Sequence, residues 1–218
     1  MKLLLICDDY WHPYEVLARG LAFLTENGHT IDTVFDAKDI VTVDLLKKYD
    51  VVIIAKGNNI HSGNQHAWFD DGVTLLSPAG YKKYVEEGGS LIALHAGVSF
   101  TKDDCPEMTD FIGASFVMHP KQCPVDIKIT LPDHPITEGV SDFHIVHDEH
   151  YFIERTENEG IVFAESVSAH GTQPAGILRT MGKGRMCLFT PGHNILVYET
   201  PGFRKMLLNI IEWTGFER

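Results

Sequence analysis

Two stretches of the chain are apolar at every position, and they restrict the fold more than any other feature. Residues 3–7 read Leu-Leu-Leu-Ile-Cys and residues 51–55 read Val-Val-Ile-Ile-Ala, with no alternation of polar and apolar side chains. A strand has this pattern when both of its faces are covered, as in the middle of a parallel sheet. Helical patterns lie between such strands, so the sequence predicts a doubly wound α/β fold with a parallel sheet.

Strand and helix patterns alternate through the first half of the chain. The helical pattern from Pro13 to Gly28 begins with a proline, which suits a first helical turn, and ends at a glycine. The predicted strands are residues 3–7, 30–35, 51–55 and 90–94, and the predicted helices are residues 13–28, 43–49, 78–87 and, at the end of the chain, 203–213.

The pattern changes after about residue 124. Residues 126–130 alternate, as expected for a strand with one face in water. Further strand patterns lie at residues 143–146, 161–164, 176–179 and 186–189. Short connections such as residues 182–184 favour antiparallel pairing, so we expect an antiparallel extension of the sheet in the C-terminal half. The chain has 218 residues and neither repeat nor linker, and we expect one domain over residues 1–218.

Charge and composition exclude several classes of function. The formal net charge is −12 and no basic patch is visible, so we expect no nucleic-acid partner. No stretch approaches the roughly 18 apolar residues of a membrane span, so we expect no membrane association. The four cysteines are far apart and favour neither a disulfide framework nor a zinc knuckle, which predicts a cytoplasmic location.

Polar residues follow four of the predicted strands. Ligands of an open parallel sheet bind beyond the carboxyl ends of its strands, so these positions are candidates for a site. They are Asp8 to His12 after the first strand, Lys56 to Asn59 after the third, His95 after the fourth, and His193 with Asn194 after the strand at 186–189.

The segment from Gly88 to Gly97 is the most informative of these. It combines a buried strand pattern with small residues after His95, and this is the arrangement of a tight strand-to-helix elbow that presents one side chain above the sheet. It resembles the elbow of class I glutamine amidotransferases, whose pattern is Gly-hydrophobic-Cys-x-Gly. Because an imidazole cannot form the glutamyl thioester, we expect no glutaminase activity.

Five motifs in the same order resemble the trehalose-utilisation (ThuA-like) family of the class I glutamine amidotransferase-like superfamily. They are the Gly-Gly strand and His-Ala elbow at 88–97, Ile-Gly-x-x-Phe with His-Pro at 112–120, His-Pro-Ile-Thr-x-Gly at 134–139, Asp-Glu-x-Tyr at 148–151, and Gly-x-Gly-Arg to Pro-Gly-His at 182–193. The resemblance implies a flavodoxin-like fold. It also implies an enzyme of carbohydrate utilisation that acts on trehalose, a related disaccharide or a keto derivative, with hydrolase, lyase or isomerase chemistry.

Histidines and carboxylates of these motifs are expected to form the site. His95 is predicted to be the central acid/base or metal-ligand residue, with His193 and Glu149 assisting. The predicted substrate-binding residues are Trp11, Asn58, His119, Asp148, Tyr151 and Asn194. A divalent metal is left open, with His95, His119 and His193 as its candidate ligands, because irregular spacing does not decide between a metal site and a proton-transfer site.

Other interpretations stay open at this stage. A non-catalytic sugar-binding or regulatory protein could have the same fold, whereas a true amidotransferase would need a reactive thiol at the elbow. The expected partner is a neutral small carbohydrate, and a homo-oligomer is left open. Four further histidines lie in polar, turn-like contexts and are predicted to be at the surface: His29, His61, His144 and His170.

Overall fold

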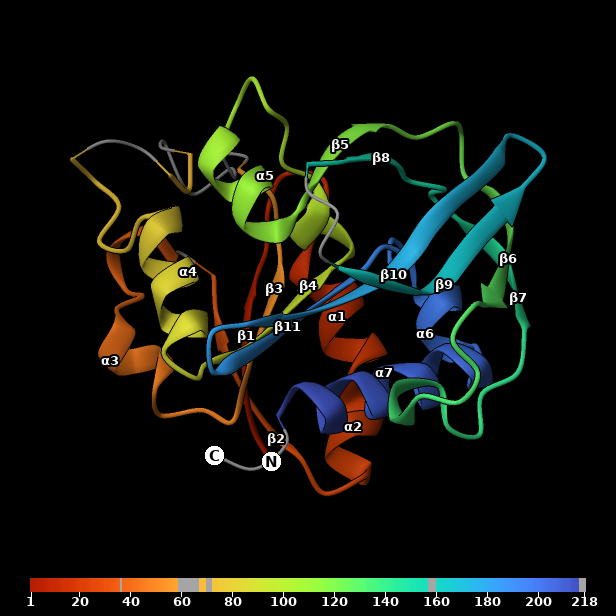
Figure 1. Ribbon diagram of the computed structural model, residues 1–218, viewed down its shortest axis with the longest axis horizontal. Helices are drawn as coiled ribbons and strands as arrows, with labels where there is room; N and C mark the ends of the chain where they lie inside the picture. The colour runs from red at the N-terminus through yellow and green to blue at the C-terminus, as the bar shows by residue number, and fades with distance from the viewer. Residues whose placement is uncertain (36, 59–66, 70–71, 157–159, 216–218) are drawn as a thin grey trace.

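A mixed sheet of nine strands runs through the molecule in the order β2-β1-β3-β4-β11-β10-β9-β6-β7 (Figure 1). In this computed structural model, residues 1–35, 37–58, 67–69, 72–156 and 160–215 are described. The strands of the sheet are β1 (Lys2–Cys7), β2 (Thr30–Val34), β3 (Val51–Ala55), β4 (Ser90–Leu94), β6 (Cys123–Ile129), β7 (Phe143–Asp148), β9 (Ile161–Ser168), β10 (Gly171–Met181) and β11 (Gly184–Phe189).

Five of these strands, β2-β1-β3-β4-β11, are parallel and have the order of a flavodoxin-like sheet. Both faces of this half are covered by helices, which is why its strands are apolar without alternation. Leu3 and Leu5 belong to one core cluster and Leu4 and Ile6 to the other. The first cluster contains residues of α1 (Tyr14–Gly20), α2 (Ala22–Glu26), α6 (Ile195–Glu199) and α7 (Pro201–Thr214). The second contains residues of α3 (Val43–Leu46), α4 (Pro78–Glu86) and α5 (Pro106–Ile112).

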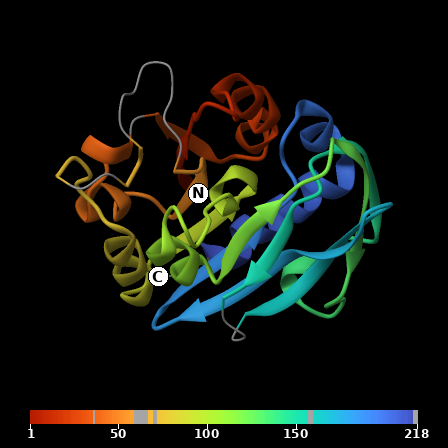
Figure 2. The ribbon, with the colours of Figure 1, turned by 90° about the horizontal axis from the view of Figure 1, so that it is seen from above.

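The other four strands pair antiparallel and extend the sheet beyond β11. Figure 2 shows this extension projecting to one side of the helix-covered half. A separate two-stranded sheet joins β5 (Ala114–Met118) to β8 (Phe152–Arg155). The remaining elements are the short 3-10 helices η1 (Ala37–Asp39), η2 (His95–Val98) and η3 (Pro135–Thr137).

The predicted fold class is confirmed, including the antiparallel extension in the C-terminal half. Strands at 51–55 and 90–94 have the predicted bounds, whereas the predicted helix at 13–28 is divided at Leu21. The backbone of Leu21, with φ −91° and ψ 0°, lies outside the helical region. Helix α5 was not predicted, although Pro106 at its start and Gly113, with φ +83°, at its end are ordinary helix boundaries.

The prediction that His29 lies at the surface is wrong. Its side chain is buried, because the turn after α2 folds back over the start of β1, where Thr30 donates to the carbonyl of Met1. His144 and His170 are exposed as predicted, and His61 lies outside the described residues. Among the helices of the described ranges, none has both the length and the apolar character needed to cross a membrane.

Candidate functional site

The elbow after β4 places His95 at the carboxyl edge of the parallel strands. His95 is the first residue of η2 and has φ +44°, a left-handed conformation that is unusual for a residue with a side chain. Two residues later, a Cβ atom on Gly97 would lie 2.1 Å from the carbonyl oxygen of Ile54. Only a glycine therefore allows the turn to pack so closely against β3.

Packing and one hydrogen bond fix the orientation of the His95 ring. The side chain is buried, and its Nδ1 lies 2.8 Å from the carbonyl oxygen of Thr190, just after β11. Because a carbonyl only accepts, Nδ1 carries the hydrogen and Nε2 faces the other way. The ring also packs against Tyr151, with 4.4 Å between ring centroids, and the Tyr151 hydroxyl lies 3.2 Å from Nε2.

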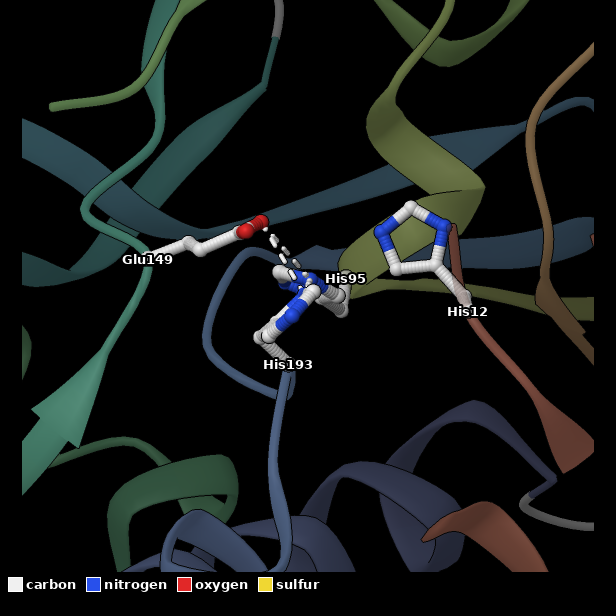
Figure 3. Close-up of side chains that lie close together, drawn as sticks. All are labelled: His12, His95, Glu149 and His193. Carbon is white, nitrogen blue, oxygen red and sulfur yellow. Dashed lines mark hydrogen bonds and ion pairs between the residues drawn. The ribbon is translucent and has the colours of Figure 1, made fainter. Parts of the chain in front are cut away.

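The imidazoles of His12 and His193 and the carboxylate of Glu149 lie around the Nε2 atom of His95 (Figure 3). His12 comes from the loop after β1, Glu149 directly follows β7, and His193 lies in the loop after β11. The His193 Nδ1 is 3.1 Å from Glu149 Oε2 and 3.3 Å from His95 Nε2, which is itself 3.6 Å from Glu149 Oε2. One ligand-type atom from each of the four residues lies within 4.8 Å of the others. Four separate segments of the chain thus build one cluster.

Asp148 holds the His193 loop in place. Its buried carboxylate accepts hydrogen bonds from the backbone N–H groups of Gly192, at 3.1 Å, and His193, at 3.0 Å. Gly192 has φ +149°, and a Cβ atom there would lie 2.8 Å from the Cβ of His95. Burial raises the pKa of Asp148 to about 7, although these N–H groups act in the opposite direction. The residue positions His193 rather than facing the cluster.

Asp9 has the same function for His12. One carboxylate oxygen accepts from the backbone N–H of Trp11 and of His12 and lies 2.8 Å from His12 Nδ1. The other oxygen accepts from the backbone N–H of Gly57, just after β3, at 2.7 Å. Burial alone would raise the pKa of Asp9, but the hydrogen bond from His12 and those from the backbone outweigh it and lower the pKa. An ionised Asp9 therefore fixes the Nδ1–H tautomer of His12.

The electrostatics of the cluster differ sharply between its members. Burial lowers the pKa of His95 to about 4, so this ring is neutral at pH 7. Burial would raise the pKa of Glu149, but its hydrogen bonds with His193 and His95 outweigh that effect and lower the pKa. Burial would lower the pKa of His193, and the bond to Glu149 raises it instead. At pH 7 the cluster therefore contains an ionised Glu149 paired with His193, beside a neutral His95.

A cavity of about 520 Å³ opens next to the cluster. Trp11 contributes an exposed aromatic face, Tyr151 lies in the wall as a buried ring packed against His95 and His119, and Glu149 and His193 connect the cavity to the cluster. The described residues that line it are Trp11, His12, Ser99, Thr101, Asp104, Phe116, His119, Glu149, Tyr151 and His193, and none of them is a lysine or an arginine.

The structure brings together most of the residues that the sequence singles out, and it places the others elsewhere. His95, His193 and Glu149 form the cluster, and Trp11, His119 and Tyr151 line the cavity. Asn58 donates to Asp104 and accepts from the backbone of Phe69, whereas Asn194 caps α6 by accepting from Leu196. Asp148 binds the loop described above.

Two features of the site differ from the sequence-based expectation. His119, a candidate metal ligand, is outside the four-residue cluster. Its Nε2 lies 3.6 Å from Glu149 Oε1, whereas His193 and His95 contact the other oxygen, Oε2. His12 takes the fourth place instead. Its position after β1 was a signal for it, and so was the spacing Asp9-x-x-His12, which places a carboxylate beside its Nδ1.

Comparisons with known proteins agree with this architecture. The family model described as trehalose utilisation (ThuA) matches residues 11–214. A protein described as ThuA-like from Parabacteroides merdae is 17% identical, with a TM-score of 0.76 over 99% of this chain and 90% of that one. A cytoplasmic protein from Salmonella typhimurium is 14% identical, with a TM-score of 0.70 over 98% of this chain and 99% of that one.

A protein provisionally described as part of a GMP synthase from Thermoplasma acidophilum is also similar. It is 16% identical, with a TM-score of 0.61 over 97% of this chain and 92% of that one. At these identities the solved structures show a shared fold and nothing finer. No curated protein is significantly similar to the chain.

Proposed function

Because the chain belongs to the trehalose-utilisation (ThuA) family, we propose that it is an enzyme acting on a neutral carbohydrate, namely a disaccharide or a keto derivative of one. The observation that carries the proposal is the cluster of His12, His95, Glu149 and His193 at the edge of a cavity with aromatic walls. A location in the cytoplasm is part of the same proposal and is supported by the description of the similar Salmonella protein.

The walls of the cavity suit a sugar. Sugars present apolar ring faces and many hydroxyl groups, so flat aromatic surfaces combined with polar side chains hold them well. Trp11, which is exposed, supplies such a surface, and Ser99, Thr101 and Asp104 supply hydroxyl and carboxylate groups. The buried Tyr151 packs against His95 and His119 and closes the cavity wall behind them. A volume of about 520 Å³ lies within the range of small-molecule sites.

The charge of the cavity favours a neutral ligand over an anionic one. Asp104 and Glu149 line it, and its described lining has no basic side chain other than histidine. Lys56, which follows β3, is buried with its Nζ over the ring of Trp68. Arg185 lies at the start of β11, the opposite end of the strands. A phosphorylated sugar would therefore be repelled at this cavity.

The cluster supplies the chemistry that hydrolases, lyases and isomerases of sugars share, which is the activation of a hydroxyl group, a carbon–hydrogen bond or a water molecule. Neutral His95 offers the lone pair of Nε2, and Glu149 and His193 share a proton beside it. These residues either pass a proton to and from the sugar themselves or hold a metal that activates water. A thioester mechanism is excluded because the elbow residue is a histidine.

Catalysis fits the elbow better than simple binding does. A histidine with φ +44° is strained relative to ordinary backbone, and such strain is concentrated at active sites and ligand clamps. A sugar-binding protein has no need to gather three imidazoles around a carboxylate at the edge of its cavity. We therefore favour the enzyme over a non-catalytic sugar-binding or regulatory protein.

Thermal shift against a ligand panel tests the proposal. We expect neutral disaccharides or their keto derivatives to stabilise the protein, by about 2.7 kcal/mol at a hundred times the dissociation constant. Sugar phosphates and nucleotides are expected to have no effect. Sugars that stabilise the protein are then tested for turnover.

A pair of neighbouring aromatic residues provides the control. Trp11 lines the cavity, whereas Tyr10, equally exposed and in edge contact with it, does not. Trp11→Ala should weaken sugar binding about tenfold, the equivalent of one lost ring contact, and Tyr10→Ala should leave it unchanged. Stabilisation by phosphates or nucleotides with no response to neutral sugars at millimolar concentration would refute the carbohydrate proposal.

A further inference from the structure

We propose that the cluster is a binding site for a single divalent transition metal, with zinc as the first candidate. Its ligands are His95 Nε2, His193 Nδ1 and Glu149 Oε2, and His12 faces the fourth position. The inference rests on the location of the proposed active site but not on its substrate, because metal binding can be measured without any sugar.

The separations between the ligand atoms match those around a tetrahedral ion. Zinc lies about 2.0–2.1 Å from imidazole nitrogen and carboxylate oxygen, so two ligands at a tetrahedral angle are about 3.3 Å apart. The three pairs among His95, His193 and Glu149 are 3.3, 3.1 and 3.6 Å apart. Three different segments of the chain therefore place their donor atoms at the edge length of one coordination tetrahedron.

The outer nitrogens of two histidines are engaged in the way that metal ligands require. His95 Nδ1 donates to the carbonyl of Thr190 and His12 Nδ1 to the carboxylate of Asp9, each at 2.8 Å. In both rings this leaves Nε2 for the cluster, and the Tyr151 hydroxyl lies close to both Nε2 atoms, 3.2 Å from His95 and 3.4 Å from His12. Such outer hydrogen bonds fix the tautomer and the ring orientation of metal-binding histidines.

The ligand set is that of a catalytic site rather than a purely structural one. Two histidines with one carboxylate are a known set for catalytic zinc, and cysteine, which is typical of structural zinc sites, is absent from this cluster. The side chains of the four residues are between 4% and 20% exposed, so an ion here would be shielded from bulk water. Glu149, His12 and His193 also line the cavity, so a metal held by the cluster would border the space where a ligand would enter.

Cobalt titration of the chelator-treated full chain tests the site. Co²⁺ is the probe because four- and five-coordinate Co²⁺ absorbs visible light much more strongly than the hydrated ion. We expect one equivalent to bind with a visible spectrum of this kind, and one equivalent of Zn²⁺ to remove it. Circular dichroism of each protein establishes that it is folded before titration.

Variants assign the binding to the named residues. Glu149→Gln, which keeps the shape and loses the charge, and His193→Asn should each lower Co²⁺ affinity about 100-fold or more, and Asp9→Asn about tenfold through His12. His144→Asn is the matched control. It removes an exposed imidazole that pairs with Asp126 and lies outside both the cluster and the cavity, and it should leave both stoichiometry and spectrum unchanged.

Failure of this inference is distinct from failure of the proposed function. If the chelated wild-type protein binds no Co²⁺ at 1:1 stoichiometry, or if Glu149→Gln and His193→Asn titrate like the wild type, there is no metal site here, even where neutral sugars still bind. If Co²⁺ binds as expected and no sugar does, the metal site stands and the carbohydrate proposal fails.

Discussion

Two substitutions of His95 separate its chemical role from its structural one. His95→Ala and His95→Asn both remove Nε2, the atom at the centre of the cluster. They differ in what they leave behind, because the amide nitrogen of an asparagine can occupy the place of the imidazole Nδ1 and donate to the carbonyl of Thr190. Asparagine also tolerates the left-handed φ of +44° better than alanine does.

The stability costs follow from the contacts. Alanine leaves the Thr190 carbonyl without its donor, which costs about 1–3 kcal/mol, and removes the ring contact with Tyr151, worth about 0.5–1.5 kcal/mol. We therefore expect His95→Ala to lose about 2–4 kcal/mol and His95→Asn about 1 kcal/mol. For a chain of this length these correspond to decreases in Tm of roughly 4–16 °C and 2–4 °C. The first value is larger than a strand-end position suggests from sequence alone, because the side chain is buried.

In His95→Ala and His95→Asn, the loss of activity should not be proportional to the loss of stability. Calorimetry gives the Tm values, and turnover of a sugar found by thermal shift gives the activity per folded molecule. Both variants should lose nearly all activity. Ile92→Ala is the control, since truncation of this fully buried side chain should cost about 2–5 kcal/mol and leave the folded fraction active. An active His95→Asn protein would show that Nε2 is dispensable and would refute the reasoning.

Three further predictions concern other parts of the chain. Burial lowers the pKa of His29 below 6.5, so its neutral form stabilises the fold above pH 6.5, and this contribution is lost as the pH falls through the folded-state pKa. In His29→Asn, the free energy of unfolding measured in urea should therefore change less with pH between pH 7 and 5 than in the wild type. An unchanged pH dependence would contradict this prediction. Treatment with iodoacetamide should leave function largely intact, because burial raises the pKa of Cys7 to about 12 and only Cys123 is partly exposed. Rapid inactivation that sugar prevents would show instead that a cysteine takes part in function. Gly97→Ala should lose about 1–3 kcal/mol or more through its clash with the Ile54 carbonyl, measured by urea unfolding, and a neutral result would mean that the elbow can relax.

The fold could be predicted because the burial of its strands is visible in their composition. Residues 51–55 and 91–94 are apolar on both faces since helices cover both, and the bounds of the two strands, 51–55 and 90–94, were predicted without error. The pairing of β5 with β8 could not be predicted in this way. Its partners are about 40 residues apart in sequence, as for Ala114 and Arg155, and no local pattern specifies a contact over that distance.

The site was only partly predictable because the position of a residue after a strand does not give the direction of its side chain. His95, Asn58 and Asn194 all follow strands. His95 faces the cluster, whereas the two amides bind nearby groups of their own segments or of adjacent loops. Amides readily satisfy backbone groups close to them, so a strand-end asparagine is weaker evidence for a site than a strand-end histidine.

Glu149 shows how long-range contacts complete a site that local patterns only suggest. β7 is the last strand of the sheet, on the far side of β10, β9 and β6 from the elbow strand β4, so its end has no reason to lie beside His95 on topology alone. The connection is Asp148, whose carboxylate binds the backbone of Gly192 and His193 in the loop after β11. This contact brings the end of the antiparallel extension back over the parallel half, and the next residue, Glu149, then reaches His193 and His95. The two neighbouring carboxylates therefore have different roles. Asp148 holds the loop of Gly192 and His193 in place, and Glu149 supplies the negative charge of the cluster.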